Sequence, residues 1–229
     1  YRNIAEEAAA DGIHWTFSPM LDMGRDPRWG RIVEGPGEDP LVGAMLAKAA
    51  IEGFQNGDIS REDSLAACAK HFIGYGASEG GRDYAHTEIS DYALYNYYLP
   101  ALTDILRDML GFEGYVVSDW GSVYQLLIQG VADDKAHCAE LAIDAGVDMD
   151  MCTGYYSDSL AKLVKEGRVT EETVNTAVRR VLRVKLAKGL FERPYTRERT
   201  VDRAEHLKDS KKLAAESAVL LKNDGVLPL

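Results

Sequence analysis

A short apolar strand that ends in an acidic residue constrains the fold of this chain most strongly. Residues 114–118 read Gly-Tyr-Val-Val-Ser, and Asp119 and Trp120 follow directly. A strand this short and this apolar is typical of a parallel sheet that is buried on both faces. Parallel α/β sheets place their chemistry at the carboxyl ends of strands, which predicts a functional position for Asp119. The alternative is that Asp119 caps the next helix, because Asp is a favoured N-cap residue.

Strand-like apolar runs alternate with helical patterns along the chain, which indicates parallel α/β architecture. A closed (β/α)8 barrel needs eight strands, and the sequence shows fewer, so any barrel would be incomplete in this chain. The predicted strands cover residues 13–19, 65–73, 114–118 and 146–151. The predicted helices cover 1–11, 40–54, 91–110, 133–144, 156–166 and 171–188.

Composition excludes several classes of partner. The net charge of −11 is not offset by a basic run, which argues against nucleic-acid binding and against an anionic membrane surface. No apolar run reaches the roughly 18 residues of a membrane span. The three cysteines (Cys68, Cys138 and Cys152) show no metal-binding spacing and are predicted to be small core residues. Asp148 and Asp150 lack a third ligand, so we expect no metal and no organic cofactor.

The N-terminus gives a further expectation. Residues 1–7 read as the middle of an amphipathic helix and lack an initiator Met. We therefore expect the domain, and any targeting segment, to begin upstream of this sequence.

Several longer motifs give a more specific indication. In their order along the chain they closely resemble glycoside hydrolase family 3, the family of β-glucosidases and β-xylosidases. The motifs are Leu21–Arg31 (LDMGRDPRWGR), Glu34–Pro40 (EGPGEDP), Ala69–Gly76 (AKHFIGYG), Glu79–Tyr84 (EGGRDY), Val117–Gly121 (VSDWG) and Ala145–Met151 (AGVDMDM).

The resemblance implies a TIM-like (β/α)8 barrel, incomplete here, over residues 1–188. It also implies a linker over 189–212 and the start of a second α/β sandwich domain over 213–229. After Pro100, a helix, a strand and a loop that the family carries are missing. They are either deleted in the protein or absent from this sequence.

The resemblance also assigns roles to residues. Asp119 corresponds to the catalytic nucleophile, and Lys70 and His71 to a pair that binds sugar hydroxyls. Arg25 corresponds to a substrate-contacting arginine, and Trp120 to an indole beside the bound sugar. For three of these residues an alternative without a role in binding stays open. His71 would then be a core histidine whose hydrogen bonds are satisfied, Lys70 would pair with a nearby aspartate, and Trp120 would pack in the core.

Other charged residues of these motifs are expected to be structural or are left open. Arginines commonly tie irregular loops to carboxylates. We therefore expect Arg28 and Arg31 to bind acids such as Glu34, Glu38 or Asp39. Arg82 and Asp83 either reach the pocket or brace their own loop. No Asp-His loop that supplies a general acid is found, so that group is expected from outside this chain.

The implied activity is that of a retaining exo-acting β-glycosidase, which removes terminal β-D-glucosyl or xylosyl residues through a covalent glycosyl-Asp intermediate. Its substrates would be oligosaccharides or aryl and alkyl β-glycosides. Its partners would be the remaining domains of the same protein, and a homo-oligomer is also compatible. A periplasmic or secreted location is favoured over a cytoplasmic one. Two alternatives remain, a Schiff-base lyase that uses the amine of Lys70 and an inactive glycan-binding fragment.

Overall fold

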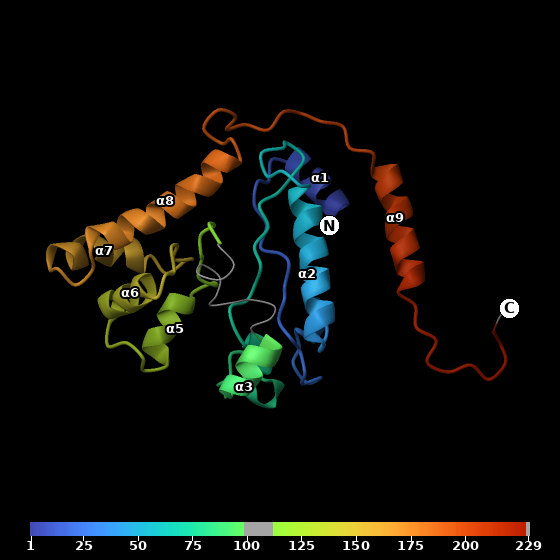
Figure 1. Cartoon of the computed structure of the whole chain (residues 1–229), viewed down its shortest axis with the longest axis horizontal. Coiled ribbons are helices and arrows are strands. Elements are labelled where there is room, and N and C mark those ends of the chain that lie inside the picture. The colour runs from blue at the N-terminus through green and yellow to red at the C-terminus, as the bar shows by residue number, and fades with distance from the viewer. Residues whose placement is uncertain (99–111, 228–229) are drawn as a thin grey trace.

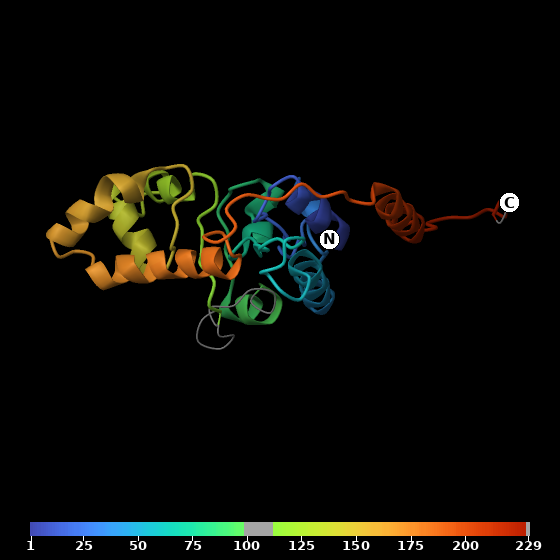
Figure 2. The same ribbon diagram turned by 90° about the horizontal axis from the view of Figure 1, so that it is seen from above.

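The computed structural model describes residues 1–98 and 112–227, and its regular elements are mostly helices. Figure 1 shows α1, α2 and α3 in the middle, α5 to α8 together on one side and α9 on the other; Figure 2 shows the same separation from above. The helices are α1 (Arg2–Ala10), α2 (Pro40–Gln55), α3 (Asp91–Ala93), α5 (Ser122–Ile128), α6 (Lys135–Asp144), α7 (Tyr155–Lys165), α8 (Glu171–Ala187) and α9 (Arg203–Glu216).

The four predicted strands are extended segments that pair in parallel. Residues of the first two segments are joined at the bridges Trp15–Ala66 and Met20–Lys70, and those of the last two at Val117–Met149. The order of pairing follows the chain order, as expected for βα units. Within the described residues the pairing consists of isolated bridges, and no closed barrel is formed. The chain is therefore α/β with parallel pairing.

The predicted helix starts are confirmed at two caps. The carboxylate of Asp39 accepts hydrogen bonds from the amides of Leu41 (2.8 Å) and Val42 (3.1 Å), and Pro40 occupies the first helical position of α2. The hydroxyl of Thr170 accepts from the amide of Thr173 (3.0 Å) at the start of α8. Local sequence alone determines both positions.

One helical prediction needs correction, and two helices begin where the sequence predicted none. Helix α5 was not predicted. The helix expected over 91–110 is α-helical only over Asp91–Ala93 and continues as a short π-helix over Leu94–Tyr98. The rest of that range lies outside the described residues. Helix α9 begins at Arg203, inside the range predicted to be a linker. The division into domains remains a prediction.

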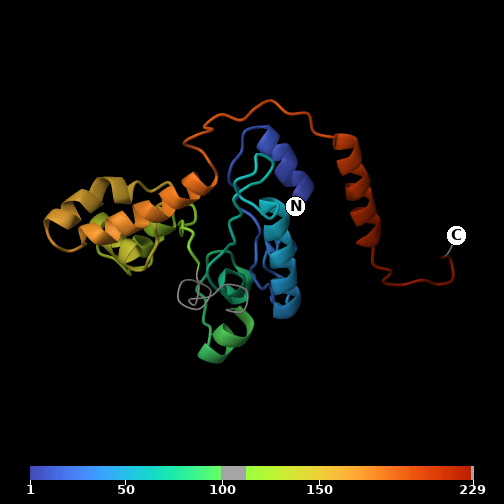
Figure 3. The same cartoon turned by 45° about the horizontal axis from the view of Figure 1, so that its top comes forward.

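Apart from a small cluster of Leu21 and Ala47, the clustered apolar side chains of the described residues form two separate groups. One lies among α5 to α8 and includes Cys138 and Leu163, both fully buried. The other joins α1, α2 and the second strand segment through Ala5, Phe54 and Leu65. Figure 3 shows α1 and α2 side by side, as this cluster requires. None of the helices in the described ranges is long and apolar enough to cross a membrane.

The cysteines are only partly core residues. Cys138 is buried, which agrees with the prediction of a core residue. Cys68 is half-buried, and Cys152 is exposed. Cys152 has a φ of 69°, in the turn between the last strand segment and α7. Its side chain does not enter the core, so the core prediction for Cys152 is wrong.

A buried lysine after α8 links this helix to the loop before the second strand segment. Lys188, which follows α8, is 6% exposed. Its ammonium donates to the carbonyls of Arg61 (2.6 Å) and Ser64 (2.6 Å) and to the Ser64 hydroxyl (3.0 Å). Burial lowers the pKa of Lys188. These bonds fix the end of α8 against the loop that precedes the second strand segment.

Helix α9 contacts α1 through His206, which predicts a pH-dependent attachment. Nδ1 of His206 lies 2.6 Å from Glu7 and Nε2 lies 3.1 Å from Glu6, and these hydrogen bonds raise the pKa of His206 above its ordinary 6.5. Because folding raises the pKa of His206, the stability that His206 adds to the attachment of α9 is complete below pH 6.5. This stability is lost as the pH rises through the folded-state pKa. We therefore expect the protection factors of the α9 amides, which are corrected for the intrinsic base-catalysed exchange rate, to fall over this interval. In the variant His206→Gln the protection factors should no longer change with pH over this interval; an unchanged pH dependence would contradict the assignment.

Candidate active site

Asp119 lies at the end of a paired strand, as the sequence predicts. Val117 bridges to Met149, and the amide of Ser118 donates to the Met149 carbonyl (2.9 Å). Helix α5 has Gly121 as its N-cap and no side-chain cap, so the helix-cap alternative for Asp119 is wrong. One carboxylate oxygen of Asp119 accepts from the amide of Trp120 (2.7 Å), and 42% of the side chain is exposed. The carboxylate is thus fixed by backbone on one side and open on the other.

His71 lies at the end of the neighbouring strand segment and faces Asp119. Its Nε2 is 3.7 Å from Oδ2 of Asp119. Its Nδ1 is 2.7 Å from Oδ2 of Asp22, and its backbone amide donates to the same oxygen (3.0 Å). The side chain of Asp22 is 1% exposed. Three residues that end three different strand segments therefore meet at one point.

An aromatic group supports His71 from another direction. The ring of Tyr75 contacts the imidazole of His71 edge-on, with 4.7 Å between the ring centroids. It contacts the ring of Trp29 edge-on as well, with 5.3 Å between the centroids. Arg31 lies over the Tyr75 ring at 5.5 Å and donates to its hydroxyl (3.5 Å). Burial raises the pKa of Tyr75 well above its usual range, so the phenol is neutral at physiological pH.

The remaining charged residues of the motifs mostly brace loops. Arg31 binds Glu34 through two nitrogens (2.7 Å each), which confirms that prediction. Arg28 binds Asp26 (2.6 Å), which was not among the acids expected for it. Asp83 accepts from the indole nitrogen of Trp29 (3.1 Å), so its side chain braces the loop.

The other predicted site residues lie around this point. Lys70 precedes His71, and both the Lys70–His71 and the Phe72–Ile73 peptide bonds are cis. Among the described residues Lys70 has no ion-pair partner, so the alternative of an Asp pair is not supported there. Hydrogen bonds from Arg31 hold the pKa of Glu34 below its ordinary value, and the charge of Lys70 adds to this effect. Trp120 is 74% exposed, which rules out core packing.

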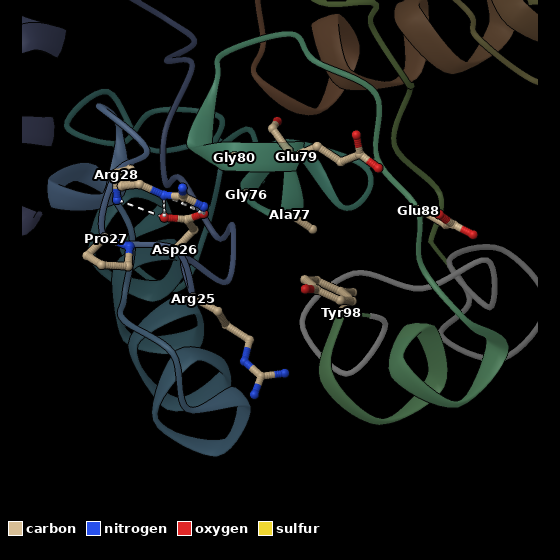
Figure 4. Close-up of a pocket in the computed structure, with 11 residues that line it drawn as sticks. Arg25, Asp26, Pro27, Arg28, Gly76, Ala77, Glu79, Gly80, Glu88 and Tyr98 are labelled. Carbon is tan, nitrogen blue, oxygen red and sulfur yellow. Dashed lines mark hydrogen bonds and ion pairs between the residues drawn. The ribbon is translucent and has the colours of Figure 1, made fainter.

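Arg25 borders an open pocket of about 570 Å³. Its guanidinium lies over the ring of Tyr97 at 4.9 Å, and Figure 4 shows it pointing away from the Asp26–Arg28 pair. The pocket is lined by Arg25, Asp26, Pro27, Arg28, Gly76, Ala77, Ser78, Glu79, Gly80, Glu88 and Tyr98. Asp119 and His71 do not line it. Arg25 is thus the only predicted site residue at this pocket among the residues that the structure describes.

Sequence reasoning did not assign Asp22 or Tyr75 to the site. A signal for Asp22 was available. It lies near the end of the first strand segment, as Lys70 and His71 lie near the end of the second and Asp119 near the end of the third. For Tyr75 no such signal exists, since its contacts depend on how the loop folds. Within the described ranges, no group of three His, Cys, Asp or Glu side chains could hold a metal ion.

A family model agrees with this arrangement of motifs. The model for the "Glycosyl hydrolase family 3 N terminal domain" matches residues 2–101 and 98–184. The chain belongs to glycosyl hydrolase family 3. The two matched ranges of the family 3 model meet at residues 98–101, where the sequence predicts a missing segment; the structure around this join lies outside the described residues.

Relatives within family 3 cover the whole chain. It is 36% identical to a periplasmic β-glucosidase of Salmonella typhimurium, over 97% of this chain and 34% of that protein. It is 34% identical to a putative β-xylosidase of Formosa agariphila, over 99% of this chain and 35% of that protein. The crystal structure of a β-glucosidase from Listeria innocua in complex with isofagomine superimposes with a TM-score of 0.95 at 38% identity, covering 100% of this chain and 38% of that one. The chain therefore spans about a third of the length of these relatives.

Proposed function

We propose that this chain is part of the catalytic domain of a retaining exo-acting β-glycosidase in which Asp119 is the nucleophile. The observation that carries the proposal is the position of Asp119: a half-exposed carboxylate at a strand end, 3.7 Å from an imidazole. In such enzymes the carboxylate attacks the anomeric carbon, the glycosidic bond breaks, and a covalent glycosyl-enzyme forms that water then hydrolyses.

The surrounding residues suit the binding of a sugar. We assign His71 and Lys70 to hydroxyl groups, because an imidazole and an ammonium are good hydrogen-bond partners for them. Trp120 offers an exposed indole that can stack on the apolar face of a pyranose. Arg25 would contact the substrate from the rim of its pocket. The second carboxylic acid, about 5–5.5 Å from the nucleophile in retaining enzymes, would come from outside this chain.

We further propose that the two parallel strand pairs belong to a (β/α)8 TIM-like barrel over residues 1–188. The linker over 189–212 and a second α/β sandwich domain from 213 would follow. The superposition on a β-glucosidase structure supports this, since all of this chain matches 38% of that one with a TM-score of 0.95. The strand-end position of the site also fits a barrel, whose active sites lie at the carboxyl ends of the strands.

The substrate class follows from the names of the relatives. β-Glucosidase and β-xylosidase relatives support terminal β-D-glucosyl or xylosyl residues of oligosaccharides or of aryl and alkyl glycosides. Two relatives are named periplasmic enzymes, which supports a periplasmic location. The proposed reaction needs only carboxyl groups and hydroxyl ligands, so we expect no metal or organic cofactor.

The full-length protein tests the proposal. We expect it to hydrolyse 4-nitrophenyl β-glucoside or β-xyloside, with the β-anomer as the first product by NMR and with no effect of EDTA. An inverted product or loss of activity in EDTA would refute the mechanism. Treatment with borohydride and a carbonyl substrate tests the lyase alternative, since only an imine on Lys70 would be trapped.

A further inference from the structure

The contact between Asp22 and His71 has no role in the proposed reaction so far. Asp22 lies beneath the site, with a side chain that is 1% exposed, and one of its oxygens accepts from both the backbone amide and the ring Nδ1 of His71. A carboxylate so deeply buried is costly unless hydrogen bonds compensate it. Both of these bonds go to the same residue, so Asp22 fixes the main chain and the ring of His71 together.

This contact determines which nitrogen of His71 carries the proton. An ionised carboxylate only accepts hydrogen bonds. The 2.7 Å contact to Oδ2 of Asp22 therefore requires a hydrogen on Nδ1. Nε2 is then the nitrogen that faces Asp119, and it is available to a ligand. The ring of Tyr75, edge-on at 4.7 Å, limits rotation of the imidazole away from this orientation.

The gap between His71 and Asp119 suits a hydroxyl group. The distance of 3.7 Å between Nε2 and Oδ2 of Asp119 is too long for a direct hydrogen bond. A sugar hydroxyl beside Asp119 can instead lie about 2.8 Å from Nε2, the ordinary length of such a bond. In the Nδ1–H tautomer this hydroxyl donates its one hydrogen to the lone pair on Nε2, so it does not also donate to Asp119, whose carboxylate is an acceptor as well.

We propose that Asp22 is a positioning residue that holds His71 as its Nδ1–H tautomer, so that Nε2 serves a sugar hydroxyl beside the nucleophile. This rests on the proposed glycosidase function. Asp22 does not touch the substrate and acts through His71. A comparable buried Asp–His contact in serine proteases fixes the histidine tautomer, and its replacement by Asn leaves the geometry intact but the wrong nitrogen protonated.

The test is the nearly isosteric variant Asp22→Asn in the full-length protein. Its amide can donate to Nδ1 and so favours the other tautomer. We expect kcat on an aryl β-glucoside to fall about 100-fold, at the upper end of effects seen when an orienting partner is removed. Nitrogen NMR with ¹⁵N-labelled histidine should show the proton on Nδ1 in the wild type and on Nε2 in the variant. The matched control is Asp63→Asn, a carboxylate bound to Arg2 (2.8 Å) and Arg61 (2.9 Å); it should lose stability and keep kcat.

A double-mutant cycle separates positioning from general structure. If Asp22 acts through His71, then in a His71→Gln background Asp22→Asn should change kcat less than about twofold. Fully additive losses, or wild-type kcat in Asp22→Asn, would overturn the proposal. So would a wild-type His71 protonated on Nε2 alone, a measurement that requires no variant to fold. An inactive wild-type enzyme with His71 in the Nδ1–H tautomer would instead refute the glycosidase function and leave the positioning of His71 standing.

Discussion

Replacing Asp119 by alanine in the full-length protein is expected to reduce kcat on aryl β-glucosides by several orders of magnitude. The substitution removes the proposed nucleophile, and the interactions that bind the sugar remain. KM should therefore change far less than kcat. Azide should restore turnover, because a small anion can enter the space that the carboxylate leaves and attack the same carbon. The product would then be a glycosyl azide of inverted configuration.

Stability should distinguish this result from simple unfolding. The side chain of Asp119 does not cap α5 and is 42% exposed, so its removal should alter the unfolding free energy by no more than about 0.5 kcal/mol. The control Asp133→Ala removes a carboxylate that is 95% exposed and should leave kcat unchanged. Intact-mass analysis with a 2-fluoro-glycoside should place the label on Asp119. A label on Asp22 or Asp148 would show that the assignment is wrong.

Two features of the structure, the helix starts and the strand ends, were predictable because local sequence determines them. Helix caps depend on a few adjacent residues, so the starts of α2 and α8 follow from Asp39, Pro40 and Thr170. The strand ends follow from the switch between an apolar run and a polar loop, which located Lys70, His71 and Asp119. The family resemblance supplied their roles, and those roles still await the experiments above.

Contacts between distant residues were not predictable in the same way. Asp22 and His71 are 49 positions apart, and Trp29 and Asp83 are 54 apart. No periodicity connects such pairs, because their contact depends on how two long loops fold against each other. The same reason explains the absence of Tyr75 from the predicted site. Asp148, part of an Asp-x-Asp motif that superficially resembles a metal site, instead binds Arg180 (2.8 Å) and the amide of Val116 (2.8 Å).

Trp29 connects its own loop to the loop from Tyr75 to Tyr84. It is 1% exposed, and its indole nitrogen donates to Asp83 (3.1 Å). The opposite loop approaches it through glycines: a Cβ on Gly76 would lie 3.1 Å from the indole, and one on Gly81 would lie 2.7 Å from the Trp29 amide nitrogen. Gly81 also has a φ of 68°, which side chains rarely tolerate. The loop from Tyr75 to Tyr84 is therefore shaped around this indole.

The variant Trp29→Ala should destabilise the domain by about 3–5 kcal/mol, the usual range for truncation of a buried Trp. Trp29→Phe should cost less, since it keeps an aromatic ring and loses chiefly the hydrogen bond to Asp83. The unfolding midpoint measures both. Because the indole also supports Tyr75, which contacts His71, we expect the folded fraction of Trp29→Ala to lose activity as well.

Phe54→Ala provides the matched control for this variant. Phe54 is 2% exposed and lies in the cluster with α1, so its truncation should cost a similar free energy. Its buried partners in this cluster, Ala5, Ala9 and Leu65, lie outside the loop of Tyr75, so below the unfolding transition its kcat should equal that of the wild type. If Trp29→Ala also retained wild-type kcat below its transition, the indole would stabilise the domain without organising the site. A selective loss in Trp29→Ala would show that the contact of Trp29 with Tyr75 helps to hold His71 in place.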